Sequence, residues 1–213
     1  MHQAADAFLR QLIWRDFAYH QLIHFPEILH SPLRSQFQAF PWVGTSAQLE
    51  KWKEGRTGYP LVDAGMRQLR ETGFIHNRVR MVVASFLVKH LLIPWTAGSD
   101  WFRETLVDFD EANNAMGWQW VTGSGIDAAP YFRIFNPIMQ SEKFDPNGFF
   151  IRRWVPELGE LPAKYTHRPW AAPADVLEEA GIRIGEDYPF PMIDHALARN
   201  RALAAYDTAK GKA

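Results

Sequence analysis

Three short stretches of this sequence carry side chains that can hold a planar heterocycle. In the first, Gln11, Trp14 and Arg15 lie three and four positions apart, so they would share one face of a helix. An amide, an indole and a guanidinium together can hydrogen-bond a nucleobase, stack on it and contact a phosphate. An amphipathic helix with a half-buried Trp14 explains the same spacing, and spacing alone favours that plainer interpretation.

The second stretch repeats this spacing. Asn77, Arg80 and Met81 would share a helix face, while Arg78 points roughly opposite to Arg80. Asn and Arg at the start of a helix suit anions and planar heterocycles. The alternative is that these residues only cap the helix and form surface ion pairs. Taken by themselves, the four residues favour this structural role.

In the third stretch, Asp110, Asn114 and Trp118 recur every four residues, which lines up a carboxylate, an amide and an indole. Trp118 and Trp120 are about 200° apart around a helix, so they face different compartments. Gly117 would let a ligand approach the backbone closely. Because a polar stripe is costly in an ordinary core, this stretch favours a functional role.

Other reaction classes find little support. No G-x-G-x-x-G opens a helix after a strand, and the sequence contains no P-loop and no G-x-S-x-G nucleophile motif. Its lack of cysteine excludes disulfides, thiolate zinc sites and a cysteine nucleophile. His20 and His24 are spaced to share a metal ion, but a third ligand is not evident, so we expect no metal site.

The composition is that of a globular protein with an excess of aromatic residues. A net charge of −1 argues against a surface coated with Lys and Arg, although it allows a local basic patch. Nine Trp and fifteen Phe exceed the needs of a core of this size; stacking roles explain the excess, and a Trp-rich core is the alternative. We find neither a secretory signal nor a membrane-spanning run, and expect a cytoplasmic protein.

Helical periodicity accounts for nearly every ordered-looking segment, so the predicted fold class is all-α. Ser46 and Ser99 are expected to cap two helices at their N-termini, and Gly73 to end another. Residues 127–145, punctuated by Pro130, Asn136-Pro137 and Asp145-Pro146, are expected to form a loop. The expected helices cover about 5–25, 46–55, 60–72, 76–92, 99–107, 110–121, 148–158, 174–180 and 193–209.

Five strings occur in an order that resembles the FAD-binding domain of class I cyclobutane-dimer photolyases and related cryptochromes. The strings are LIWRDF (12–17), GRTGYPLVDA (55–64), HNRVRM (76–81), GWQW (117–120) and APYFRIFNP (129–137). The resemblance covers nearly the whole chain. It implies a multi-helical bundle of the photolyase/cryptochrome type over residues 1–209, followed by a flexible tail at 210–213.

The resemblance also implies a reaction. In this family a U-shaped FAD lies beside a pocket for a flipped-out pyrimidine dimer, and light drives an electron from reduced flavin to the dimer, which then splits. The implied partner is UV-damaged DNA containing pyrimidine dimers, the implied class is a deoxyribodipyrimidine photo-lyase, and we expect a monomer that does not bind membranes.

Site residues follow position by position from the same resemblance. Residues that would hold FAD are Arg15, Asn77, Arg80, Asp108, Asp110 and Asn114, with Asn114 facing flavin N5. Residues that would contact the dimer or the DNA are Gln11, Trp14, Arg78, Met81, Trp120, Gln140 and Lys143. Residues that would carry electrons to the flavin are Trp118, Trp95 and Trp42.

Two departures from the family pattern qualify these expectations. Gln11 stands where dimer photolyases usually have glutamate and is closer to the (6-4) photolyase pattern, whereas Asn77 and Met81 follow the dimer pattern. The antenna domain and the loop that cradles the FAD phosphates have no counterpart, so we expect a partial domain without an antenna pigment. The alternatives are a cryptochrome-type photosensor and a remnant that binds no cofactor.

Overall fold

The computed structural model describes residues 2–131 and 133–211, and within this part of the chain no β-strand occurs. Ile184 and Tyr188 form an isolated bridge. The all-α prediction is therefore confirmed. The α-helices are α1 (His2–His24), α2 (Ser46–Lys53), α3 (Pro60–Thr72), α4 (Asn77–Ser85), α5 (Trp95–Thr105), α6 (Glu111–Thr122), α7 (Pro137–Phe144), α8 (Phe149–Trp154), α9 (Ala163–Thr166), α10 (Ala174–Glu179) and α11 (His195–Ala209).

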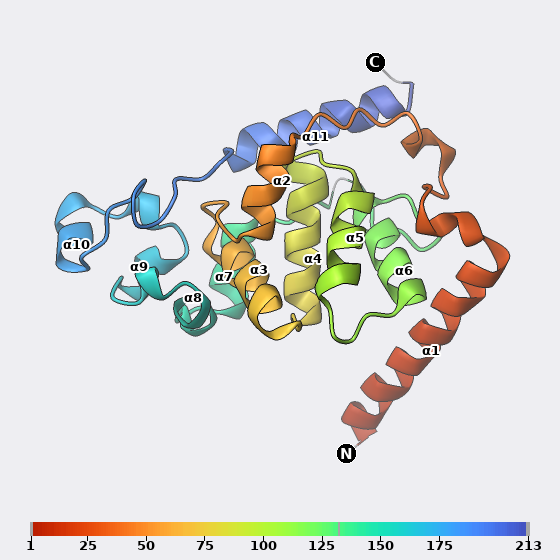
Figure 1. The fold of residues 1–213 in the computed structure, drawn as a ribbon, viewed down its shortest axis with the longest axis horizontal. Helices are drawn as coiled ribbons and strands as arrows, with labels where there is room; N and C mark the ends of the chain where they lie inside the picture. The colour runs from red at the N-terminus through yellow and green to blue at the C-terminus, as the bar shows by residue number, and fades with distance from the viewer. Residues whose placement is uncertain (1, 132, 212–213) are drawn as a thin grey trace.

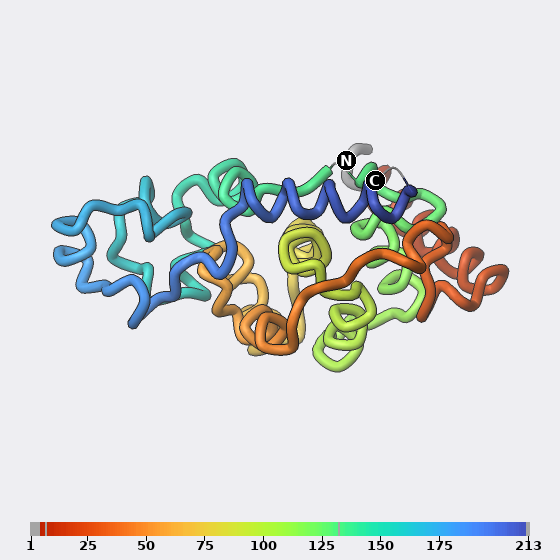
Figure 2. Tube along the Cα trace, turned by 90° about the horizontal axis from the view of Figure 1, so that it is seen from above, coloured from red at the N-terminus to blue at the C-terminus, as the bar shows by residue number. Residues whose placement is uncertain are grey.

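The helices form an elongated molecule with a central bundle (Figure 1). Helices α2 to α6 lie side by side in this bundle, and α8, α9 and α10 make a lobe at one end. Helix α1 projects at the opposite end, where it packs on α6. Helix α11 crosses the bundle (Figure 2) and contacts the π-helical turn η3 (Phe86–His90), which follows α4.

The bundle core explains why α3 forms where the sequence predicts it. Leu61, Val62, Met66 and Leu69 are buried on the face of α3 that meets the main apolar cluster. Proline fits the first helical position because the backbone amide there has no hydrogen-bond partner within the helix. Gly73 ends the helix with a left-handed φ of 68°. The predicted range 60–72 is confirmed. It could be predicted because both signals that bound the helix act locally.

Two predicted N-caps are wrong. The cap of α2 is Thr45, whose Oγ1 accepts from the amide of Gln48 while the Gln48 side chain accepts from the Thr45 amide. This reciprocal capping box outcompetes Ser46. Helix α5 starts at Trp95, directly after Pro94, so Ser99 lies buried inside the helix rather than at its start.

The prediction of a loop over 127–145 is wrong for its second half, which α7 occupies. Asn136 caps this helix by accepting hydrogen bonds from the amides of Ile138 and Met139. Pro137 follows at the first helical position. An Asn-Pro pair often indicates a turn, but here it is the start of a helix.

Two further helices are shorter than predicted. The helix expected over 148–158 consists of α8 followed by a 3₁₀ turn, η4 (Pro156–Leu158), since Pro156 cannot continue an α-helix. The helix expected over 76–92 divides into α4 and η3, and Leu92 beyond it adopts a left-handed φ of 52°. Of the expected tail at 210–213, Lys212 and Ala213 lie outside the described residues, as does Phe132 of the fifth string.

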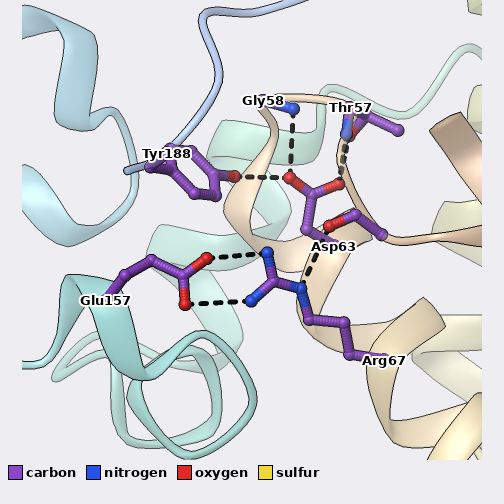
Figure 3. Close-up of polar contacts among 7 residues, drawn as sticks. Thr57, Gly58, Asp63, Arg67, Glu157 and Tyr188 are labelled. Atoms are coloured by element: carbon purple, nitrogen blue, oxygen red, sulfur yellow. Dashed lines mark hydrogen bonds and ion pairs between the residues drawn. The ribbon is translucent and has the colours of Figure 1, made fainter. Parts of the chain in front are cut away.

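Part of the second string has a structural role at the boundary between the bundle and the end lobe (Figure 3). Asp63 is fully buried and accepts hydrogen bonds from the Thr57 amide (2.7 Å), the Thr57 hydroxyl (2.6 Å), the Gly58 amide (3.0 Å) and the Tyr188 hydroxyl (2.6 Å). Burial raises the pKa of Asp63, while the hydrogen bonds oppose that shift. Next to it, Arg67 forms an ion pair of 2.7 Å with Glu157.

Candidate functional site

A cavity of about 670 Å³ opens between α1, α4 and α6. We call it the α1–α6 cavity. Its size lies within the range of small-molecule and cofactor sites. Ten residues predicted to act on the cofactor or the lesion line it, although they come from three separate stretches of the sequence: Gln11, Trp14, Asn77, Arg80, Met81, Asp108, Asp110, Asn114, Trp118 and Trp120.

Helix α1 contributes one aromatic wall. Trp14 is 40% exposed, and its ring meets the edge of Phe17 at a centroid distance of 5.9 Å. A half-exposed indole beside a cavity can stack on a planar ligand. Arg15, predicted to hold the cofactor, is not part of the wall; its guanidinium instead lies 3.5 Å from the Asp110 carboxylate.

Asp110 caps α6 and is held as an anion. Its Oδ1 accepts from the Asn113 amide (2.9 Å) and side chain (2.8 Å), and its Oδ2 accepts from the Tyr19 hydroxyl (2.8 Å). Burial acts to raise the pKa of Asp110, but these hydrogen bonds and the Arg15 guanidinium outweigh it and lower the pKa below its ordinary value. The first turn of α6 therefore presents a fixed carboxylate to the cavity.

Arg80 and Asp108 also line the cavity. Arg80 Nη2 donates to both Asp108 oxygens, at 2.8 and 2.7 Å, and Nε donates to the carbonyl oxygen of Ile75 at 2.7 Å. These charge-assisted bonds tie α4 to the segment after α5 and fix the orientation of the guanidinium. A flat cation with spare N–H groups then faces the cavity, which suits the carbonyl or phosphate oxygens of a ligand.

Asn114 is oriented by a residue whose role the sequence did not indicate. Its Nδ2 donates to the Ser99 hydroxyl at 2.9 Å and to the Ser99 carbonyl oxygen at 3.3 Å. This arrangement leaves Asn114 Oδ1 as the amide atom available to accept a hydrogen bond from a ligand. A polar residue at position 99 was visible in the sequence, but its contact depends on how α5 packs against α6.

The predicted electron carriers all belong to the main core or pack against it. Trp118 and Trp95 are buried, and Trp42 is partly buried. The ring of Trp118 meets Phe102 at 5.1 Å and Trp52 at 6.5 Å, two aromatic neighbours that the sequence did not single out. The order Trp118, Trp95, Trp42 remains a prediction.

The predicted DNA-contacting residues outside the cavity gather around one aromatic ring. The Arg78 guanidinium lies 3.9 Å from the centroid of Phe144, and Lys143 Nζ lies 5.3 Å from it. Gln140 joins Arg78 and Phe144 in the wall of a second cavity of about 440 Å³. Residues from α4 and α7 thus form one basic surface, which we call the Phe144 surface.

The α1–α6 cavity fits a flat heterocycle such as the flavin implied by the resemblance. Trp118 lines it and has a buried Nε1 without a hydrogen-bond partner among the described residues. Asn114 Oδ1 is available, and a side chain at Gly117 would meet open space. No group of three metal-ligating side chains occurs in the described part of the chain, and none of its helices is long and apolar enough to cross a membrane.

Comparison with known proteins finds similarity to photolyases and cryptochromes. A family model described as the FAD binding domain of DNA photolyase matches residues 8–208. The deoxyribodipyrimidine photo-lyase of Agrobacterium fabrum is 56% identical over 203 residues, which are 95% of this chain and 42% of that protein. Cryptochrome-1 of Arabidopsis thaliana is 44% identical over 199 residues, which are 92% of this chain and 29% of the plant protein.

A solved structure agrees with these sequence relatives. A bacterial class III photolyase from Agrobacterium tumefaciens superposes with a TM-score of 0.94 at 56% identity, covering 96% of this chain and 42% of that chain. The chain therefore spans less than half the length of the relatives described here.

Proposed function

Because this chain belongs to the family of the FAD-binding domain of DNA photolyase, we propose that it serves light-driven repair of cyclobutane pyrimidine dimers in DNA. One observation carries the proposal: nine residues predicted for cofactor or lesion contact, together with the predicted electron carrier Trp118, meet in the wall of the α1–α6 cavity. FAD, when bound in its reduced form, supplies the electron that splits the dimer. The protein's task is to bind, orient and shield the reacting groups.

In this proposal, the wall divides into a cofactor side and a lesion side. Arg80, held by Asp108, would donate hydrogen bonds to the flavin, and Asn114 Oδ1 would accept a hydrogen bond from an N–H group at the flavin edge. Trp14 and Trp120 pack against the two rings of the flipped-out dimer, which stack well on indoles. Gln11 hydrogen-bonds the pyrimidine carbonyl and imide groups.

The Phe144 surface would hold the DNA backbone on either side of the flipped-out dimer. Arg78 and Lys143 supply positive charge there, and Gln140 supplies a neutral donor. Contacts of this type fix the register of the DNA and carry no sequence information, which suits an enzyme that must find a lesion in any sequence. The net charge of −1 means that DNA binding depends on such local groups.

A second function has specific support. Cryptochrome-1 of Arabidopsis thaliana is 44% identical, and Gln11 lacks the charge of the glutamate usual in dimer photolyases. Both features allow a photosensor that uses the same flavin and tryptophans without repair. Cleavage of dimers under illumination separates the two functions, because only the repair enzyme restores intact pyrimidines.

The absorption spectrum of the purified chain, followed by a repair assay, tests the proposal. We expect the near-ultraviolet and blue bands of oxidised flavin after reconstitution with FAD. After chemical reduction, blue light should convert dimers in a UV-irradiated oligonucleotide to pyrimidines, and the dark control should not. Bound flavin with persistent dimers would favour the photosensor, and a colourless chain would contradict the cofactor assignment. Gel filtration of the same sample tests the expected monomer, and cell fractionation tests the expected cytoplasmic location.

A further inference from the structure

Three glycines lie inside α-helices of the described chain: Gly65 in α3, Gly98 in α5 and Gly117 in α6. Glycine weakens a helix interior relative to alanine, so each position calls for a compensating reason. Packing supplies that reason twice. A Cβ at Gly65 would lie 2.5 Å from Val79 Cγ1, and a Cβ at Gly98 would lie 2.2 Å from the ring of Trp118.

Gly117 has no such reason. A Cβ built on it would meet no atom within 4 Å, and the residue is exposed. Its backbone is ordinary α-helix and not left-handed, so any L-amino acid could adopt it. Folding of this chain therefore does not require glycine at this position.

The position of Gly117 points to a ligand instead. It lines the α1–α6 cavity, with Asn113 and Asn114 one helical turn before it and Trp120 and Val121 one turn after it in the same wall. Bare backbone thus lies at the middle of the cavity face of α6, between amides on one side and an indole on the other. A flat ring can lie directly against such backbone, whereas a methyl group would hold it away.

We propose that Gly117 is a contact position for the flavin ring: its missing side chain lets the ring reach van der Waals contact with α6. At that depth the edge of the ring comes within reach of Asn114 Oδ1, which Ser99 orients. The inference rests on the proposed function and adds a residue that determines how deeply the cofactor enters.

The variant Gly117→Ala tests this with opposite expected effects on folding and binding. Without ligand, its melting temperature should rise above that of the unmodified chain, because alanine favours the helix and meets no neighbour. Its affinity for riboflavin, a probe with the flavin ring and no phosphate, should fall about tenfold or more, the order expected when a methyl group enters a packed contact. Fluorescence quenching of riboflavin measures the affinity.

Gly65→Ala is the matched control, since it adds the same methyl group to a helix that does not line the cavity. Its melting temperature should fall, and riboflavin affinity of the folded fraction should stay unchanged. Equal riboflavin affinity in Gly117→Ala and the unmodified chain, or a lowered melting temperature in Gly117→Ala, would overturn this inference and leave the proposed function standing. Failure of the unmodified chain to bind either riboflavin or FAD would overturn the proposed function, and the inference with it.

Discussion

Trp118 combines two properties that are rarely found together: it is buried, and its indole nitrogen has no hydrogen-bond partner among the described residues. In the proposed site this indole is the electron donor next to the flavin. Trp118→Phe should therefore abolish photoreduction of oxidised FAD by the chain while leaving repair by chemically reduced FAD in place. The measurement is the loss of the blue absorption band under illumination.

Trp154→Phe offers a matched control for that experiment, because Trp154 lies in α8 and packs on the second apolar cluster, away from the cavity. It should photoreduce at the rate of the unmodified chain. If Trp118→Phe also kept that rate, electrons would be reaching the flavin by another route, and the assignment of Trp118 would be wrong.

A second indole of the proposed site, Trp14, is partly exposed at the cavity. Trp14→Ala should weaken binding of a UV-damaged oligonucleotide by about 1–3 kcal/mol, the usual contribution of one base-stacking partner. Titration of the labelled oligonucleotide measures this loss. Phe8→Ala removes another exposed aromatic ring from α1 but none from the cavity wall, so it should bind as the unmodified chain does. Equal losses in both variants would contradict the stacking role.

At the scale of helices and turns, a helix boundary can be predicted from the sequence where a local signal sets it. The ends of α3 depend on Pro60 and Gly73, which act within one turn of the helix, and both were predicted. The start of α7 also depends on a local signal, but Asn136 followed by proline is ambiguous between a turn and a helix cap. The π-helical turn η3 carries no comparable local mark, so the sequence predicted an unbroken helix there.

The turn η3 buries a lysine, and this predicts a dependence of stability on pH. Lys89 is 1% exposed, and its Nζ donates to the carbonyl oxygen of Arg133 at 3.2 Å. Burial, and then the nearby Arg133 cation, lower the pKa of Lys89 from 10.5 to about 7. Between these pH values the unfolded chain binds a proton that the folded chain does not, so the free energy of unfolding should rise with pH.

Urea unfolding at pH 7 and at pH 10 measures this effect. The rise attributable to Lys89 should approach about 1.4 kcal/mol per pH unit within the window, and Lys89→Met should remove it. Lys51→Met changes an exposed lysine on α2 and should leave the slope as it is. An unchanged slope in Lys89→Met would show that this lysine stays protonated in the folded protein.

At the scale of the whole molecule, the site depends on contacts between segments that are distant in the sequence. The spacing of Asp110, Asn114 and Trp118 predicted that they share a wall, because one helix carries them all. The position of Arg80 in the same cavity, and the contact of Ser99 with Asn114, depend on how α4 and α5 pack on α6. Such packing has no periodic pattern in a single sequence, so the family resemblance was needed to connect the segments.

The same reasoning applies to the boundary between the bundle and the end lobe, where Asp63, Tyr188, Arg67 and Glu157 meet (Figure 3). Burial and the Asp63 carboxylate raise the pKa of Tyr188 well above its ordinary value, so the hydroxyl stays protonated and donates a hydrogen bond to Asp63. Tyr188→Phe removes this donor from a buried carboxyl group. The free energy of unfolding should fall by about 1–3 kcal/mol, measured by urea unfolding.

Tyr165→Phe is the control, because the Tyr165 hydroxyl makes no hydrogen bond to any described residue. That variant should unfold with the free energy of the unmodified chain. Since Asp63 and Tyr188 join the main core to the second apolar cluster, the loss should appear in the lobe first, as faster hydrogen exchange in α8 than in α4. Equal acceleration in both helices would mean that the lobe and the bundle unfold as one unit, with the hydrogen bond stabilising both.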